Sequence, residues 1–240
     1  SQLVAALGPE AVMAHAKTFE RLCMGQLHET LPRPAGTDPV DHYIQVLADK
    51  TGSLIAVSAR YGAMLTRAGA ATERVVEEFG EKIGVAFQLA DDVIDLASDS
   101  ETTGKTPGTD LREGVDTMPV LLLRKALAAG ELDAAGQAIL SRLSTGNLAD
   151  DAVLADVVAR LRLHPVLART REMAMTWARE AVGALAGLED AVLAGTRERL
   201  DAAGAGGAER EAALADAARR VALVREGMEQ FARLLVDRAS

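Results

Sequence analysis

One stretch of the sequence, Gly84 to Gly114, combines regularly spaced acidic residues with a lysine-containing segment. On a helix its polar residues fall on one stripe, because residues three and four apart lie on the same face. They are Gln88, Asp91, Asp92, Asp95 and Asp99. Apolar residues surround the stripe, so we expect this helix to be buried on most of its circumference. Carboxylates that converge where water is scarce need cations to neutralise them, and all-oxygen ligands suit Mg²⁺.

The segment that follows, Ser98 to Asp110, is rich in Ser, Thr, Gly, Pro and Asp and is predicted to be a loop. Within it, Lys105 is flanked by Gly104 and by Thr106-Pro107-Gly108. A mobile lysine beside an acidic metal site suits a polyanion that also binds the metal, and diphosphate is the simplest such ligand. In the alternative interpretation, the aspartates form a solvated helix face and the loop is only a connector.

The composition favours a single helical domain over the whole chain, 1–240. The chain has 49% hydrophobic and only 3% aromatic residues, and Ala and Leu outnumber the β-branched residues. A formal net charge of −9 argues against a nucleic-acid partner, which would require a basic surface. It does not argue against a diphosphate substrate, because Mg²⁺ and a few lysines can bind that anion locally.

The sequence contains one cysteine, Cys23, which excludes an intramolecular disulfide and suits a reducing cytoplasm. We expect it to be a small buried residue on a helix. No apolar run approaches the ~20 residues of a membrane span, and no signal segment opens the chain. The first residue is Ser1, within what is interpreted as a connection, so we expect an upstream portion to be missing.

Periodicity and breaker residues predict a series of helices. The predicted ranges are 10–30, 39–65 with a bend at Gly52-Ser53, 71–99, 115–129, 132–143, 150–161, 165–194 and 208–238. The first carries Gln26 and Glu29 on one face, next to Gly25. In the second, Lys50 and Thr51 stand side by side at the helix break, where an ammonium and a hydroxyl can contact phosphate.

The sequence FQLADDVIDL followed by GKTPGTDLREG resembles the second aspartate-rich motif of the trans-polyprenyl diphosphate synthases. Gly25-Gln26 and Lys50-Thr51 resemble two further elements of that family. The resemblance is strong over residues 1–130, whereas 131–240 is a divergent helical remainder. The chain departs from the family pattern at Glu29, where Asp is usual, and at Val115, where a lysine is usual.

The resemblance implies an all-α bundle of the isoprenoid-synthase type and a Mg²⁺-dependent head-to-tail condensation of isopentenyl diphosphate with an allylic diphosphate. Asp91, Asp92 and Asp95 would hold Mg²⁺. Lys50 and Lys105 would contact the allylic diphosphate. Phe87, Gln88, Thr51 and Gln26 would line the reacting centre. It also implies a homodimer, and contact with a membrane surface if the product is long.

The family's first aspartate-rich motif is absent from these residues. Asp150-Asp151 is not flanked by arginine pairs, and we interpret it as a solvated helix start. We therefore expect a bundle that lacks its N-terminal helices and is inactive alone. Three alternatives remain open, namely a non-catalytic partner subunit of a synthase, a terpene-cyclase-like protein and a purely structural helical protein.

Overall fold

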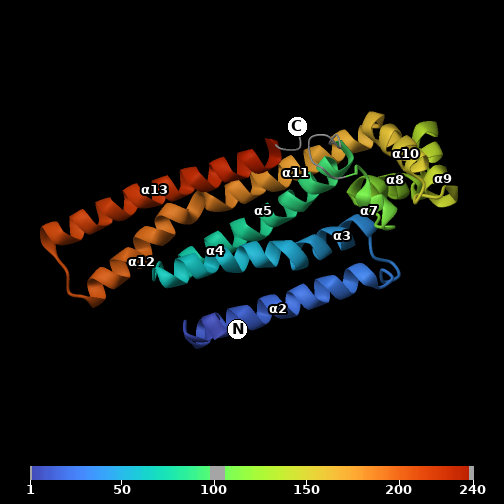
Figure 1. Cartoon of the computed structure of the whole chain (residues 1–240). Helices are drawn as coiled ribbons and strands as arrows, with labels where there is room; N and C mark the ends of the chain where they lie inside the picture. The colour runs from blue at the N-terminus through green and yellow to red at the C-terminus, as the bar shows by residue number, and fades with distance from the viewer. Residues whose placement is uncertain (1, 98–105, 238–240) are drawn as a thin grey trace. The chain divides into compact units, whose positions relative to one another are not determined.

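The computed structural model describes residues 2–97 and 106–237, and every regular element in those two ranges is helical (Figure 1). The helices are α1 (Gln2–Ala5), α2 (Pro9–Thr30), α3 (Pro39–Leu47), α4 (Ser53–Leu65), α5 (Ala70–Ala97), α7 (Thr109–Arg112), α8 (Met118–Ala128), α9 (Ala134–Thr145), α10 (Asp151–Leu163), α11 (Pro165–Ala184), α12 (Leu188–Ala202) and α13 (Gly207–Asp237). The predicted all-α class is therefore confirmed.

Two of the predicted boundaries were wrong. The segment expected to be a loop as far as Asp110 already contains helix α7, which begins at Thr109. The predicted helix 165–194 is two helices, α11 and α12, separated by a 3₁₀ turn at Leu185–Gly187, and α12 continues to Ala202. Leu185 and Leu188 are both buried, so the helical spacing of apolar residues continues across this turn. The periodicity of the sequence therefore did not reveal the break between the two helices.

The chain divides into two compact units. The described residues of the first unit are 2–31, 45–85 and 177–234, and those of the second unit are 32–44, 86–97, 106–176 and 235–237. The boundaries between the units fall inside helices α3, α5, α11 and α13 and in the link between α2 and α3. The single-domain prediction stays a prediction.

In the first unit, α2 packs against α4 and against a π turn at Ala48–Gly52. The buried residues on α2 and α4 are small, including Ala11, Ala14, Ala56 and Ala63, so the helix backbones approach closely. The π turn separates α3 from α4 and takes the place of the bend predicted at Gly52-Ser53. In the same unit, α12 and α13 lie side by side and antiparallel (Figure 1), with an ion pair between Asp201 and Arg210 near their connection.

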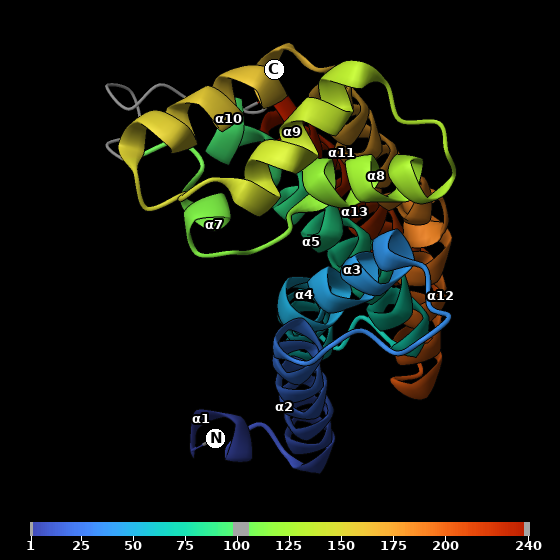
Figure 2. The same ribbon diagram turned by 90° about the vertical axis from the view of Figure 1, so that its right-hand side faces the viewer.

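In the second unit, α9 packs against both α8 and α10 (Figure 2). Two aspartates cap these helices: Asp133 accepts a hydrogen bond from the backbone N–H of Gly136, and Asp150 accepts from Ala152 and Val153. The interpretation of Asp150-Asp151 as a helix start is thus confirmed. The core of this unit includes Leu89, Val93, Leu96, Met118, Leu123, Ile139, Leu154 and Leu161.

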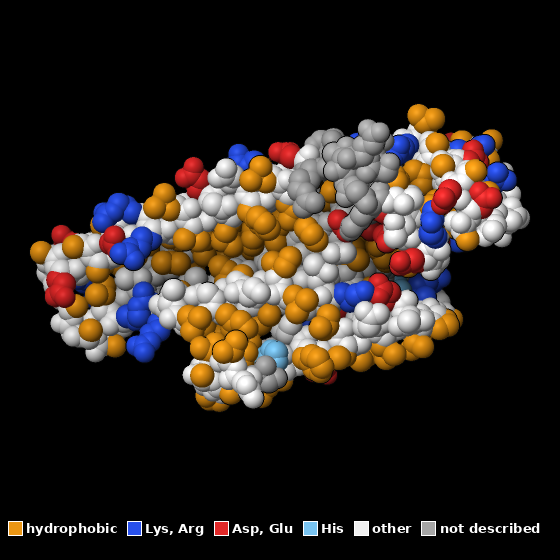
Figure 3. Space-filling model, viewed as in Figure 1, with side chains coloured by type: hydrophobic (Ala, Val, Ile, Leu, Met, Phe, Trp, Pro, Cys, Tyr) orange, Lys and Arg blue, Asp and Glu red, His pale blue; other side chains and the backbone are white. Residues whose placement is uncertain are grey.

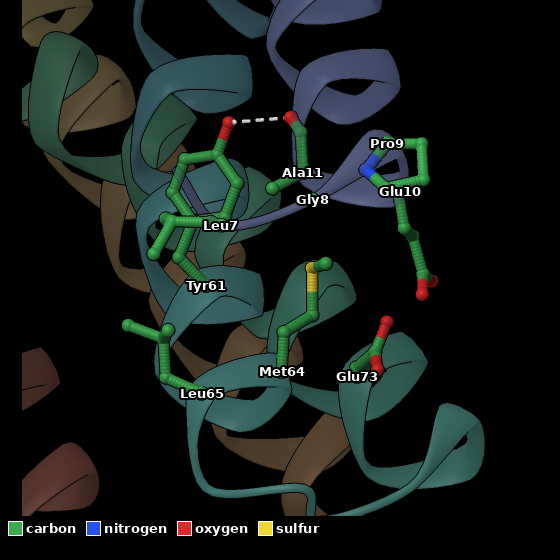
Figure 4. A pocket seen from close by; sticks show the side chains of 9 residues that line it. All are labelled: Leu7, Gly8, Pro9, Glu10, Ala11, Tyr61, Met64, Leu65 and Glu73. Carbon is green, nitrogen blue, oxygen red and sulfur yellow. Dashed lines mark hydrogen bonds between the residues drawn. The ribbon is translucent and has the colours of Figure 1, made fainter. Parts of the chain in front are cut away.

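At one end of the first unit, the link between α1 and α2 passes over α4 (Figure 4). The Tyr61 hydroxyl donates a hydrogen bond of 3.2 Å to the Ala11 carbonyl. Beside this contact, Leu7, Met64 and Leu65 help to line a cavity of about 340 Å³.

Helix α2 leaves an apolar face exposed, visible along the lower edge of the molecule in Figure 3. This face, called the α2 apolar face below, consists of Val12, Met13, Phe19, Met24 and Leu27, together with Leu31, which directly follows the helix. Cys23 is also exposed, so its predicted burial was wrong. Helix α2 is buried at Ala11, Ala14 and Gly25, and a helix that packs through one narrow stripe leaves its other positions in solvent.

Candidate functional site

The three aspartates predicted to bind metal lie near the C-terminal end of α5 and differ in their exposure. Asp91 is exposed, Asp95 is half-buried, and Asp92 is buried at 5% exposure. Adjacent helical positions point about 100° apart, so Asp91 and Asp92 face different surroundings although they are neighbours in sequence. Asp91 and Asp95 are four apart and share a face.

The carboxylate of Asp92 forms hydrogen bonds with residues of two other helices, α8 and α3. Its Oδ2 accepts a hydrogen bond of 3.0 Å from the backbone N–H of Met118, the first residue of α8. The Tyr43 hydroxyl on α3 lies 3.1 Å from Oδ1 and 3.2 Å from Oδ2. Burial raises the pKa of Asp92 to about 8, even though both hydrogen bonds favour the ionised form. Asp92 therefore connects α5 with the start of α8 and with α3.

Asp95 accepts hydrogen bonds from the chain that follows the aspartate-rich helix. Its carboxylate accepts hydrogen bonds from the backbone N–H groups of Thr109 and Asp110, in the first turn of α7. Its carbonyl accepts a further bond of 3.0 Å from the N–H of Gly108. Gly108 has φ of 77°, a conformation that glycine adopts without strain, and this lets the chain turn back onto α5.

Asp110 joins Asp91 and Asp95 as a third carboxylate of this region. Burial raises the pKa of Asp95 to about 6, and the negative charges of Asp110 and Asp91 contribute to the shift. Like charges this close favour binding of a cation, and oxygen-only ligands favour a hard divalent ion. We call Asp91, Asp95 and Asp110 the acidic face.

Within residues 2–97 and 106–237, no three His, Cys, Asp or Glu side chains form a ready-made metal-binding group. A Mg²⁺ ion that is shared with a phosphate ligand needs only one or two protein carboxylates, together with water. The donor chemistry of the acidic face therefore fits Mg²⁺ bound jointly with a diphosphate.

In the first unit, the structure brings Gln26, Glu29 and Lys50 together. The Lys50 ammonium forms an ion pair of 2.5 Å with Glu29, and the Gln26 amide donates to the same Glu29 oxygen at 3.1 Å. Lys50 and Thr51 both belong to the π turn. An isolated π turn inside a helical segment is rare and frequently marks a functional site.

The remaining predicted residues have different outcomes. Phe87 and Gln88 are half-buried in the second unit. The larger part of the predicted loop lies outside the described residues, and so do Asp99 and Lys105. The predicted site roles stay predictions for all of them.

Two side chains of this region were missed when the sequence was considered alone. Asp110 lies in the GKTPGTD segment, which was recognised as part of the motif, but no site role was assigned to this residue. The sequence did contain a signal for it, namely an acidic residue at the end of the segment that follows a carboxylate-rich helix. Tyr43 had no such signal, because its partner Asp92 is 49 residues away in sequence.

Comparisons with known proteins show to which family the chain belongs. The sequence profile of the polyprenyl synthetase family matches residues 1–151 of the chain. The chain belongs to the polyprenyl synthetase family. Among curated members, it is 42% identical over 192 residues to the nonaprenyl diphosphate synthase of Mycobacterium tuberculosis, covering 79% of this chain and 55% of that protein. It is 35% identical over 181 residues to the dimethylallyltranstransferase of the same organism, covering 75% and 53%.

A solved family structure has the same fold. The geranylgeranyl pyrophosphate synthase of Corynebacterium glutamicum, crystallised with calcium and isoprenyl diphosphate, superposes with a TM-score of 0.71 at 30% identity. The alignment covers the whole of this chain and 63% of that protein. The chain thus spans little more than half the length of the curated relatives it matches. No helix in the described part of the chain is both long and apolar enough to cross a membrane.

Proposed function

We propose that this chain is the part of a trans-polyprenyl diphosphate synthase that binds the allylic diphosphate together with Mg²⁺. The acidic face carries this proposal, because burial and the negative charges of Asp110 and Asp91 raise the pKa of Asp95 there. A purely structural helix would gain nothing from such a cluster, whereas a cation-binding site requires it. The related synthases support the same reaction class.

In this proposal Asp91 and Asp95 hold Mg²⁺, and Lys50 and Lys105 contact the diphosphate. The metal role predicted for Asp92 stays a prediction. Bound Mg²⁺ would neutralise the diphosphate oxygens as the bond to the allylic carbon breaks. Lys50 is suited to its role because Glu29, its present partner, can be exchanged for a phosphate oxygen at the same ammonium. Thr51 can donate its hydroxyl to a phosphate oxygen, while Gln26, Phe87 and Gln88 line the reacting centre.

We infer further that the protein self-associates through the α2 apolar face. Phe19 alone is 61% exposed, and the five other apolar side chains of this face are exposed as well. Apolar patches of this kind mark interaction surfaces, and a symmetric homodimer covers the same patch on both copies. We place the protein in the cytoplasm, because its lone cysteine suits a reducing compartment.

The proposal is tested in two steps with the full chain. First, titration calorimetry measures the binding of Mg²⁺ with inorganic diphosphate, and we expect binding only when both are present. Second, elongation of an allylic diphosphate with labelled isopentenyl diphosphate is measured for the chain alone and after the upstream half of a related synthase is supplied in trans. We expect turnover only in the completed pair.

The outcomes separate the alternatives. Failure to bind Mg²⁺ with diphosphate would contradict the substrate-binding role and favour a structural protein. Binding without turnover in the completed pair would favour a non-catalytic partner subunit. Turnover by the chain alone would show that the acidic face suffices without the family's first aspartate-rich motif.

A further inference from the structure

Lys50 and Thr51 owe their position to a π turn, and the structure indicates what keeps this turn from relaxing. The turn, Ala48–Gly52, carries one residue more than an α-helix would place in the same length. If the turn relaxed to regular α-helix, the register of the helix would shift by one residue. The side chains that follow would then be rotated by about 100° around the helix axis. Neighbouring groups must therefore hold it in place.

Asp49 is the residue by which the turn is held. It lies within the turn at 8% exposure. Its Oδ1 accepts a bond of 2.8 Å from the Arg21 Nε, and its Oδ2 accepts one of 3.0 Å from the Gln45 amide. Its carbonyl accepts a bond of 2.6 Å from the Ser53 hydroxyl. Every side-chain oxygen of this buried carboxylate is thus paired.

Arg21 connects the turn to two helices at once. Its backbone belongs to α2, and its terminal nitrogens donate to both oxygens of Glu81 on α5, at 2.7 Å and 3.1 Å. The guanidinium therefore bridges Asp49 and Glu81. Its planar fork of donors suits two carboxylates, whereas a lysine ammonium presents a single point charge.

The backbones on both sides of the turn are also in contact with it. A Cβ added at Gly25 of α2 would lie 2.9 Å from the Asp49 Cβ and 3.0 Å from the Lys50 Cγ. A Cβ added at Gly84 of α5 would lie 2.6 Å from the Gly52 Cα. The turn is therefore enclosed between two helices that approach it through glycines, and Arg21 ties those same two helices together.

We propose that Arg21, through Asp49 and Glu81, is a positioning residue that holds the π turn so that Lys50 and Thr51 face the diphosphate. This inference rests on the proposed function only for the identity of the ligand. Arg21 itself does not touch the substrate in this proposal. Its effect is exerted through the geometry of the turn.

Arg60 provides a matched control. It lies on α4 in the same unit and forms ion pairs with Glu10 at 3.4 Å, Glu73 at 3.2 Å and Glu77 at 3.7 Å. Figure 4 shows Glu10 and Glu73 directed toward each other at the end of the unit where α1 joins α2. Arg60→Gln therefore removes a comparable arginine network without touching the π turn.

The experiment compares Arg21→Gln, Arg21→Lys and Arg60→Gln with the wild type and with Lys50→Ala. Hydrogen exchange reports the protection of the Ala48–Ser53 backbone without ligand, and calorimetry reports the affinity for Mg²⁺ with inorganic diphosphate. For Arg21→Gln we expect faster exchange in the turn and an affinity lower by about tenfold, the scale of one charge-assisted hydrogen bond. Arg21→Lys should be intermediate, and Arg60→Gln should behave as the wild type in both measurements.

The two measurements also separate the two proposals. If the wild type does not bind Mg²⁺ with diphosphate, the proposed function fails, and exchange in the turn alone decides whether Arg21 holds it. If Arg21→Gln does not fold, Arg21→Lys decides, since it retains the charge. An Arg21 variant with a protected turn, or with an exposed turn and unchanged affinity, would overturn the inference.

Discussion

Asp92 is the residue whose replacement most sharply separates a structural role from metal binding. Its carboxylate is the acceptor for the backbone N–H of Met118, and Met118 is completely buried. Asp92→Ala leaves that N–H without its partner, which costs about 1–3 kcal/mol. Asp92→Asn keeps an oxygen at the same place. We therefore expect the Asn variant to be more stable than the Ala variant by about 1–3 kcal/mol at every pH, or a few degrees in Tm for a chain of this size.

The pH dependence of the wild type provides an independent test of the same carboxyl group. Its pKa is raised from 3.8 to about 8 in the folded protein, so folding takes up a proton between these two values. Stability falls with rising pH wherever the folded state binds more protons, so the wild type loses stability from about pH 4 to pH 8. The Asn variant has no such proton and should gain stability relative to the wild type across that range.

Both comparisons are made by thermal and urea unfolding of the metal-free proteins, followed by circular dichroism. Asp91→Ala is the control, since Asp91 is exposed on the same helix and should change stability little. Equal stability of the Asn and Ala variants would refute the acceptor role of Asp92. A constant difference between the wild type and the Asn variant from pH 4 to pH 8 would refute the buried titration.

Three further expectations follow from other parts of the molecule. Asp91→Asn should lower the affinity for Mg²⁺ with diphosphate at least about tenfold at unchanged Tm, because it removes an exposed ligand charge; unchanged affinity in calorimetry would remove Asp91 from the site. Gly84→Ala should lower stability by about 1–3 kcal/mol through overpacking, whereas Gly227→Ala in α13, where the added Cβ would meet no neighbouring group within 4 Å, should raise it. Unfolding curves that rank these two variants the other way would contradict the close packing of α5. Phe19→Asp should shift the protein toward monomer in sedimentation measurements, and an unchanged mass distribution would exclude the α2 apolar face as the contact.

The aspartate-rich helix, the Lys50-Thr51 break and the capping aspartates could all be predicted from the sequence, because each depends on residues close together in the chain. Asp38 is an example: it directly precedes Pro39 at the start of α3, and its carboxylate accepts hydrogen bonds from the N–H groups of Val40 and Asp41. Such caps need only local geometry.

The differences among the aspartates could not be predicted in the same way. Helical spacing placed Asp91, Asp92 and Asp95 on one stripe, but whether each carboxylate faces solvent or a neighbouring helix depends on partners distant in sequence. For Asp92 these partners are Tyr43 and Met118, which form hydrogen bonds with its buried carboxylate. The exposure of Cys23 was missed for a related reason, since a helix that packs through alanines needs only a narrow contact.

The π turn at Ala48–Gly52 has a consequence for how this segment tolerates changes of length. Deleting one residue from the turn would allow α3 and α4 to merge into one regular helix. The shortened chain would form regular α-helical hydrogen bonds there. The contacts that enclose the segment make it sensitive to larger side chains, and its extra residue makes it sensitive to a single-residue deletion as well. Among homologous sequences, an alignment gap of one residue at this place would mark proteins that keep the two helices but not the position that the π turn gives to Lys50.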